Sequence, residues 1–301
     1  MKTSILILGS SGLVGSRFVD LLAVERQSIT PKSVELDITD RASLNDFIKR
    51  KKDNFDVVIN FAAITNVDEI EKERGNEKGM VWQVNVEGAA NVAEAAKKHD
   101  KFLVHISTDL VFSGSEEDPG PYAEDSKLPE NLNRISWYGW TKLMGEKKVR
   151  ELNKNSAIVR ISYPFRSHYT RKIDFARNIL QLFDEGKLYP MSTDQLMTPT
   201  FIDEAASAIE EICELEKPET FHLASSDTIT PYEFANYLLE KARGAKNVVK
   251  KGLLKEFLKA PGRTPIPIFG GLDTKKTQRI LGMKFKTWKQ AVDEFIEQLN
   301  G

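Results

Sequence analysis

Hydrophobic residues in the first half of this chain follow two patterns that alternate along the sequence. Short, mostly apolar runs occupy residues 4–8, 55–61, 102–106 and 157–161. Such runs are typical of strands that are buried on both faces of a parallel sheet. The segments between them carry apolar residues at helical spacing, as in 85–97. The sequence therefore predicts an α/β fold: a doubly wound parallel sheet followed by a smaller C-terminal part.

The first apolar run ends in a glycine-rich turn that leads directly into a helical pattern. Gly9, Gly12 and Gly15 stand three residues apart. In such a turn the first glycine permits a sharp bend, the second lets backbone amides approach a phosphate, and the third lets the helix pack on the strand. The helix N-terminus adds positive potential. This arrangement predicts the binding of a dinucleotide; the alternative is a turn that serves packing alone.

Residues 27–37 are the candidate for the second strand, whose end would meet the adenosine ribose of a dinucleotide. A carboxylate at that end accepts the 2′-hydroxyl of NAD and repels the 2′-phosphate of NADP. Residues 30–32 read Thr-Pro-Lys, without an acid, which favours NADPH over NADH. Lys32 is then a candidate partner of the phosphate, or a solvated surface lysine. Asp37 is a candidate partner of the adenine, or the cap of a helix that begins near Arg41.

Two side chains with complementary chemistry stand four residues apart in a predicted helix. Tyr138 and Lys142 would lie on one face, one turn apart. A nearby ammonium favours the phenolate and so lowers the pKa of a phenol from its usual value of about 10. Thr108, at the end of the run 102–106, offers a hydroxyl that could hold a substrate oxygen. The alternatives are a half-buried tyrosine beside a solvated lysine, and a hydroxyl that caps a turn.

Other segments add candidate binding surfaces. Ala62 and Ala63 follow the run 55–61, and small residues at a strand end let a flat ligand lie close to the backbone. Asn85 is interpreted as the cap of the helix 85–97. Residues 112–136, rich in Gly, Pro, Ser and acids, predict a long loop that serves as a lid or binding segment.

Composition narrows the function classes. The 301 residues include 43 basic and 44 acidic side chains, so no global field favours nucleic acid or an anionic membrane. The single cysteine, Cys213, excludes an internal disulfide and a thiolate metal cluster, and we predict no metal site. No apolar run has membrane-spanning length, and the first one enters a glycine turn instead of a cleavage site. A cytoplasmic location is therefore expected.

The second half predicts further elements that would complete the fold. A short strand at 220–223 is expected to return to the first sheet, and helices are expected over 174–183, from Pro231 and over 288–299. We expect residues 1–162 to form the dinucleotide-binding domain, joined by 200–224, and residues 163–301 to bind mainly substrate. Arg263 lies in a basic stretch and could hold a substrate phosphate with two hydrogen bonds; otherwise the stretch is a solvated face.

These motifs together resemble the extended short-chain dehydrogenase/reductase superfamily, and within it the dTDP-4-dehydrorhamnose reductases. The matching stretches are GSSGLVG, LDITD, VVINFAAITNVDEIEKE, VNVEGAANVAEAA, STDLVFSG, the Tyr-x-Glu at 122–124, YGWTK and GEKKV, followed by residues 194–200, 203–206, 263–265 and 271–273. The resemblance spans nearly the whole chain.

The resemblance implies NAD(P)H-dependent reduction of a keto group on a nucleotide-linked deoxysugar. The composition predicts no nucleic-acid or membrane partner, and a homodimer is a candidate assembly. The resemblance also implies that Thr108, Tyr138 and Lys142 are catalytic. The predicted cofactor contacts are Gly9, Ser11, Gly12, Leu13, Val14, Lys32, Asp37, Ile38, Ala62, Ala63, Thr65, Tyr138, Lys142 and Tyr163. The predicted substrate contacts are Val67, Asp109, Tyr163 and Arg263.

The chain departs from the family pattern where the sugar and the nicotinamide would lie. Leu110 replaces an aromatic residue, residues 160–166 read Arg-Ile-Ser-Tyr-Pro-Phe-Arg where the family has Arg-Thr-Ser-Trp-x-Tyr-Gly, and residues 130–136 form an insertion in the lid. Two other functions remain open. One is an epimerase or dehydratase that retains tightly bound NAD. The other is a non-catalytic NADP-binding subunit, as a resemblance to the regulatory subunit of methionine adenosyltransferase allows.

Overall fold

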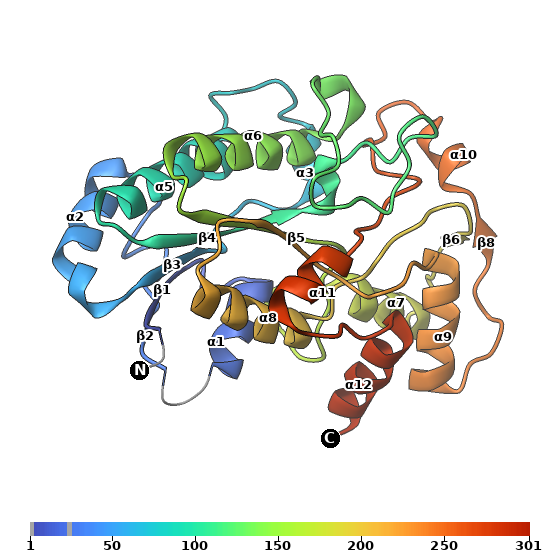
Figure 1. The fold of residues 1–301 in the computed structure, drawn as a ribbon. Coiled ribbons are helices and arrows are strands. Elements are labelled where there is room, and N and C mark those ends of the chain that lie inside the picture. The colour runs from blue at the N-terminus through green and yellow to red at the C-terminus, as the bar shows by residue number, and fades with distance from the viewer. Residues whose placement is uncertain (1–2, 23–25) are drawn as a thin grey trace.

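A computed structural model describes residues 3–22 and 26–301 of the chain (Figure 1). Within this part, a six-stranded sheet with strand order β2-β1-β3-β4-β5-β7 forms the centre, and all its pairings are parallel. The strands are β1 (Ile5–Leu8), β2 (Ser28–Ile29), β3 (Val57–Asn60), β4 (Phe102–Thr108), β5 (Ser156–Ile161) and β7 (Thr220–Leu223). The predicted fold class is confirmed.

Side chains that alternate along each strand divide the core of this sheet into two layers. Ile5 and Ile7 pack on the side of α1 (Leu13–Leu21), α8 (Ile202–Leu215) and α11 (Lys275–Leu281). Leu6 and Leu8 pack on the side of α2 (Arg41–Lys51), α5 (Ala89–Lys98) and α6 (Trp137–Leu152). Figure 1 shows these helices on opposite faces of the sheet. Because both faces are covered, both side-chain sets must be apolar, which explains the continuous apolar runs.

A second, smaller core lies beyond the edge of the sheet. It is built from α7 (Phe175–Asp184), α9 (Pro231–Arg243) and α12 (Trp288–Asn300), with a parallel pair of short strands, β6 (Met191–Ser192) and β8 (Lys251–Gly252). Phe165 packs against both Phe234 and Phe295 in its centre. The remaining short elements are α3 (Val67–Glu71), α4 (Met80–Trp82), α10 (Leu254–Leu258), the π-helix η2 (Gln83–Gly88), and the 3₁₀-helices η1 (Lys52–Asn54), η3 (Asp109–Val111) and η4 (Leu132–Arg134).

Two predicted elements are wrong in part. The strand expected over 27–37 ends at Ile29, and the chain then turns so that the backbone N–H groups of Glu35 and Leu36 donate to Lys32 O. Pro31 has no N–H to continue the ladder. The helix expected to begin at Asn85 begins earlier: η2 continues into α5, so Asn85 lies inside a helical segment and is not a cap.

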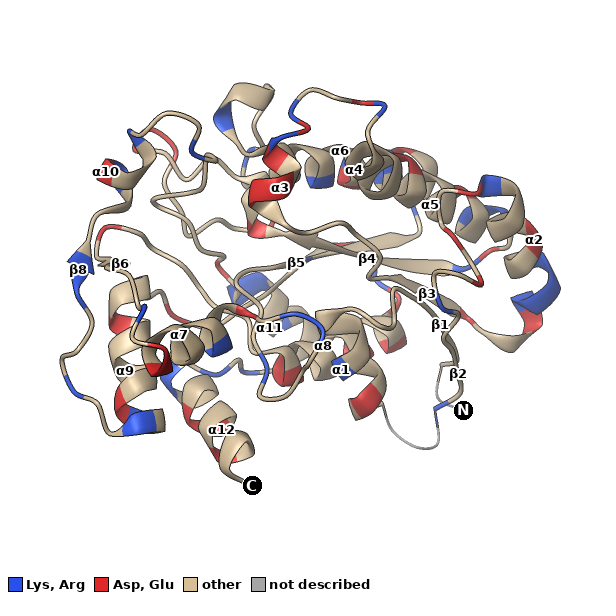
Figure 2. Cartoon of the chain, turned by 180° about the vertical axis from the view of Figure 1, so that it is seen from behind, with Lys and Arg blue, Asp and Glu red and all other residues tan. Residues whose placement is uncertain are grey.

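Charged residues of both signs are interspersed along the outer helices (Figure 2). This distribution matches the near balance of 43 basic and 44 acidic residues. No helix in residues 3–22 or 26–301 combines the length and the apolar character needed to cross a bilayer.

Candidate active site

The glycine turn brings the ends of β1 and β3 into contact. Gly9 has φ +75°, a conformation that side chains with a Cβ rarely adopt. A Cβ at this position would lie 2.6 Å from Ala62 N, so the turn also requires the missing side chain. Helix α1 then begins at Leu13, and no side chain caps its first amides. Those free N–H groups and the helix dipole fit the diphosphate of a dinucleotide.

The residues predicted to contact the adenosine lie between β2 and α2, where Lys32 and Asp37 are exposed. The Asp37 carboxylate accepts from the backbone N–H and the hydroxyl of Thr39, at 2.9 and 2.8 Å. Asp40, not Asp37, caps α2, so the helix-cap alternative for Asp37 is wrong. Ile38 is buried against α2 and α5. Lys32 is exposed, and its backbone N–H donates to Glu35 Oε2 at 2.8 Å.

Asn85 joins the loop after β3 to the helix that carries Tyr138 and Lys142. Its Oδ1 accepts from Ile64 N at 2.9 Å, and its Nδ2 donates to Ile64 O and to Thr141 Oγ1, both at 3.1 Å. The side chain is 1% exposed. An asparagine amid the alanines of a buried helix face was the available signal for this role, because a buried amide needs partners.

Thr108 and Tyr138 come together because α6 begins next to the end of β4. The Ser136 hydroxyl caps α6 by accepting from Gly139 N at 3.1 Å. A Cβ at Gly139 would collide with Leu110 O, so the helix touches the segment that follows Thr108. A hydrogen bond with Thr108 acts on the phenol of Tyr138.

Burial, not the lysine, dominates the acidity of Tyr138. Burial raises the pKa of the phenol above its ordinary value, the Asp109 charge raises it further, and the bond with Thr108 lowers it. The expected lowering of this pKa by the Lys142 ammonium is therefore wrong. Burial also raises the pKa of Asp109 to about 6, although the Ser162 hydroxyl donates to its carboxylate at 2.7 Å. Tyr138 thus stays a phenol at neutral pH, the form that can give a proton.

Lys142 is buried below Tyr138, one turn along α6. Its Nζ donates to Ile106 O at 2.8 Å and lies 3.4 Å from His105 Nε2. Burial lowers the pKa of Lys142 to about 8, and the Glu146 charge opposes this change. The ammonium is 2% exposed, so the alternative of a solvated lysine is wrong.

The other predicted substrate contacts, Tyr163, Val67 and Arg263, each have partners of their own. Tyr163 has φ +42°, and its Oη accepts from Gln195 Nε2 at 2.7 Å. Val67 packs in the cluster that contains Tyr138. The guanidinium of Arg263 lies 4.0 Å from the centroid of the Phe257 ring.

The segment that contains Arg263 contacts α3 and the predicted lid. Thr264, next to Arg263, donates to Asp68 Oδ1 at 2.8 Å and so ties this segment to the start of α3. The predicted lid also docks on the segment that follows Arg263, because Gly120 N donates to Phe269 O at 2.7 Å and Tyr122 N to Gly271 O at 2.9 Å.

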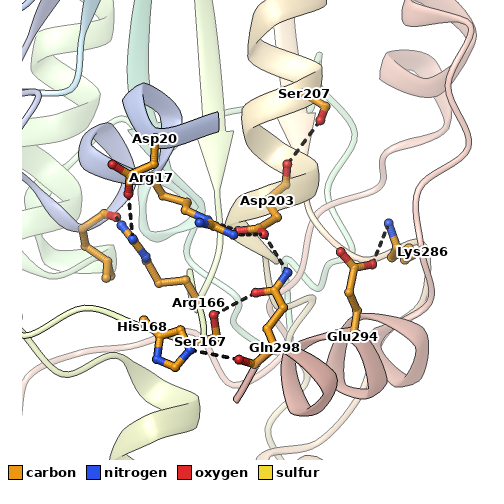
Figure 3. A network of polar contacts seen from close by, with 11 residues as sticks. Arg17, Asp20, Arg166, Ser167, His168, Asp203, Ser207, Lys286, Glu294 and Gln298 are labelled. Carbon is orange, nitrogen blue, oxygen red and sulfur yellow. Dashed lines mark hydrogen bonds and ion pairs between the residues drawn. The ribbon is translucent and has the colours of Figure 1, made fainter. Parts of the chain in front are cut away.

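A polar network behind the glycine turn joins the two cores (Figure 3). Arg17 of α1 donates to Asp203 Oδ1 at 2.7 Å, and Gln298 of α12 donates to Asp203 Oδ2 at 2.8 Å. Arg166, which replaces the family's glycine, donates to Ser16 Oγ at 2.9 Å and to Leu13 O at 3.3 Å. Arg166 therefore fixes the start of α1, the helix whose first amides would face the diphosphate.

Comparison with known proteins gives one consistent result. The family model described as the RmlD substrate binding domain matches residues 1–300. The chain is 28% identical over 298 residues to the dTDP-4-dehydrorhamnose reductase of Aggregatibacter actinomycetemcomitans, and the match covers 96% of each chain. Among solved structures, the Bacillus anthracis dTDP-4-dehydrorhamnose reductase in complex with NADP gives a TM-score of 0.86 at 26% identity, over 99% of this chain and 100% of that one. A hypothetical dTDP-4-dehydrorhamnose reductase from Sulfolobus tokodaii is 32% identical, with a TM-score of 0.76 over 94% of this chain and 97% of that one.

Proposed function

Because this chain belongs to the RmlD substrate binding domain family, we propose that it is an NADPH-dependent reductase of a keto group on a nucleotide-linked deoxysugar. The observation that carries the proposal is that Thr108, a protonated Tyr138 and a buried Lys142 meet where β4 ends and α6 begins. The same sheet contains β1, which ends in a glycine turn and an uncapped helix. Relatives that match over nearly the full length are named dTDP-4-dehydrorhamnose reductases, and one was solved with NADP.

The proposed chemistry assigns one task to each side chain. When bound, the reduced nicotinamide supplies the hydride. Thr108 holds the carbonyl oxygen, and Tyr138 gives its proton to that oxygen. Lys142 stabilises the phenolate that this leaves behind. Positioning and fixed charges at a water-poor site supply most of the rate enhancement in such a reaction.

The cofactor would lie along the carboxyl ends of β1, β3 and β4. In this proposal the amides at the start of α1 hold the diphosphate, Asp37 and Ile38 flank the adenine, and Lys32 faces the 2′-phosphate. The remaining contacts would come from Gly9, Ser11, Gly12, Leu13, Val14, Ala62, Ala63, Thr65, Lys142 and Tyr163. Tyr169 supports this placement indirectly, because its hydroxyl donates to Ser11 O at 2.7 Å and holds the turn from outside.

The sugar nucleotide would occupy the space between the two cores. We assign residues 163–301 mainly to this task, with 200–224 returning to the sheet, and we assign Val67, Asp109, Tyr163 and Arg263 to substrate contacts. Asp109 supports this choice, because its charge acts on both Tyr138 and Tyr163 and so lies near both phenols. The homodimer and the cytoplasmic location stay predictions.

A spectrophotometric assay at the NADPH absorbance band separates the candidate functions. Nucleotide-linked 4-keto sugars, supplied singly, should each be tested with NADPH and with NADH. A reductase consumes stoichiometric NADPH with at least one of them. An epimerase or dehydratase would release bound NAD on denaturation and convert substrate without net consumption. A regulatory subunit would bind NADPH and convert nothing; either of these last results contradicts the proposal.

A further inference from the structure

His105 lies in β4, buried between the loop after β3 and helix α6. Its Nδ1 lies 3.4 Å from Asn60 Nδ2, and its Nε2 lies 3.4 Å from Lys142 Nζ. Burial and the Lys142 charge hold the pKa of His105 well below its usual range. The ring is therefore neutral and carries a single N–H, on one nitrogen or the other.

The orientation of Asn60 decides which nitrogen carries that hydrogen. Asn60 Oδ1 accepts from Ala62 N at 3.0 Å, so the amide nitrogen of Asn60 must face His105. An amide NH₂ only donates. His105 Nδ1 therefore accepts, and the hydrogen is on Nε2.

This tautomer has a consequence for Lys142. The Nε2–H of His105 points at Lys142 Nζ, and an ammonium has no lone pair to accept it. A neutral amine has one, and it keeps an N–H for Ile106 O. The chain that runs from Ala62 through Asn60 and His105 to Lys142 is thus complete only when Lys142 is a neutral amine.

His222, in the same sheet, shows the opposite arrangement beside a permanent cation. Its Nε2 lies 3.3 Å from Arg160 Nη1, and its Nδ1 lies 3.1 Å from Asp273 O. A guanidinium only donates and a carbonyl only accepts, so His222 carries its hydrogen on Nδ1. The imidazole beside the arginine accepts, whereas the imidazole beside Lys142 donates.

We propose that Asn60 and His105 form a proton-positioning chain that favours the neutral amine of Lys142 and so promotes release of its proton during reduction. The inference rests on the proposed reductase function. After Tyr138 has protonated the substrate oxygen, one N–H bond of the Lys142 ammonium breaks and the phenol O–H re-forms. The amine lone pair left on Nζ then accepts from His105 Nε2–H, and water supplies the next proton.

Other charges near Lys142 leave this preference in place. Glu146 favours the ammonium, but both of its oxygens bind the Arg160 guanidinium, at 3.0 and 2.7 Å, and that cation offsets its charge. Asp109 acts on Tyr138, whereas Glu146 is the carboxylate that acts on Lys142. The raised pKa of Asp109, about 6, reflects burial. Asn60 and His105 therefore add a directed hydrogen bond to the lowering that burial imposes on the pKa of Lys142.

NMR spectroscopy of the protein without added cofactor measures the tautomer of His105 directly. Long-range ¹H–¹⁵N spectra of histidine-labelled protein distinguish a protonated Nε2 from a protonated Nδ1. We expect Nε2–H at His105 and Nδ1–H at His222, which serves as the internal reference. A hydrogen on Nδ1 of His105 overturns the proposal, whether or not the protein reduces keto sugars. A hydrogen on Nε2 in a protein that never consumes NADPH contradicts the reductase function but not the tautomer assignment.

A variant pair tests the effect on Lys142. The His105 Nε2 shift, followed from pH 6.5 to 10, reports the titration of the neighbouring amine. Asn60→Leu frees the imidazole to accept from the ammonium, so the midpoint should rise by about one pH unit. Asn153→Leu removes another buried asparagine, one that bonds Asn155 N, and should leave the midpoint unchanged. The proposal is overturned if the titration midpoint of Lys142 is the same in Asn60→Leu and in wild type. If Asn60→Leu fails to fold, the tautomer of His105 in the wild-type protein decides whether the proposal stands.

Discussion

Asp109→Asn should stabilise the folded protein at neutral pH while it impairs reduction. Asp109 is buried, and its carboxylate accepts from the hydroxyls of Ser162 and Thr108 at 2.7 and 3.2 Å. Burial nevertheless raises its pKa from 3.8 to about 6. The protein therefore holds a carboxylate whose charged form is better solvated in the unfolded chain.

The size of this effect follows from the two pKa values. Because the folded-state pKa is the higher one, the stabilising contribution is full below pH 3.8 and is lost as the pH rises through 6. At about 1.4 kcal/mol per pH unit, the loss amounts to about 1.6 kcal/mol at pH 5 and about 3 kcal/mol at pH 8. An asparagine does not titrate, so the advantage of Asp109→Asn in unfolding free energy should grow by about 1.4 kcal/mol between these pH values.

Urea unfolding of wild type and Asp109→Asn at pH 5 and pH 8, without cofactor, measures this growth. Asp203→Asn is the matched control, because Asp203 pairs with Arg17 and its replacement should lower stability at both pH values. Turnover of Asp109→Asn should fall, since we assign the Asp109 carboxylate to substrate contact and its charge also acts on Tyr138. A stability difference that is equal at both pH values, or one that favours wild type more at pH 8, would refute the reasoning.

Gly9, Lys32 and His222 can each be tested by a single substitution. Gly9→Ala should abolish NADPH binding measured by fluorescence, because φ is +75° and the added Cβ would lie 2.6 Å from Ala62 N. Lys32→Ala should raise KM for NADPH more than KM for NADH, and equal changes would remove Lys32 from the phosphate site. Burial lowers the pKa of His222 to about 3, so folding stability falls as the pH drops below 6.5. Between pH 7 and pH 5, the unfolding free energy of His222→Gln in urea should therefore fall by about 2 kcal/mol less than that of wild type. An identical fall would contradict the lowered pKa of His222.

The main sheet and the glycine turn could be predicted because they depend on local patterns. A strand buried on both faces is mostly apolar, and β1, β3, β4 and β5 are buried along their whole length. Among their few polar residues, Asn60, His105 and Arg160 have hydrogen-bond partners inside the core. The prediction failed for β2, which is two residues long at the sheet edge and carries no such run. Asn85 lies in a π-helix and bonds Ile64 and Thr141, which are 21 and 56 residues away, so no local pattern encodes these contacts.

In the candidate site, too, the positions of the residues could be predicted from local patterns, whereas their acidities could not. Residue types and spacing identified Thr108, Tyr138 and Lys142, because a strand end and one helical turn fix where these groups lie. Their acidities depend on tertiary partners instead. Burial of Tyr138 next to Asp109 reverses the expected direction of its pKa, and Asp109 owes its position to Ser162, 53 residues away in the sequence.

Replacement of Tyr138 by phenylalanine tests the central claim most directly. The change removes the phenol hydroxyl and leaves the glycine turn, Lys142 and the start of α1 intact. We predict that Tyr138→Phe binds NADPH with a Kd within about twofold of wild type and reduces its best keto sugar about a thousandfold more slowly, because general acid catalysis is lost. Turnover equal to that of wild type, with NADPH binding intact, would contradict the account.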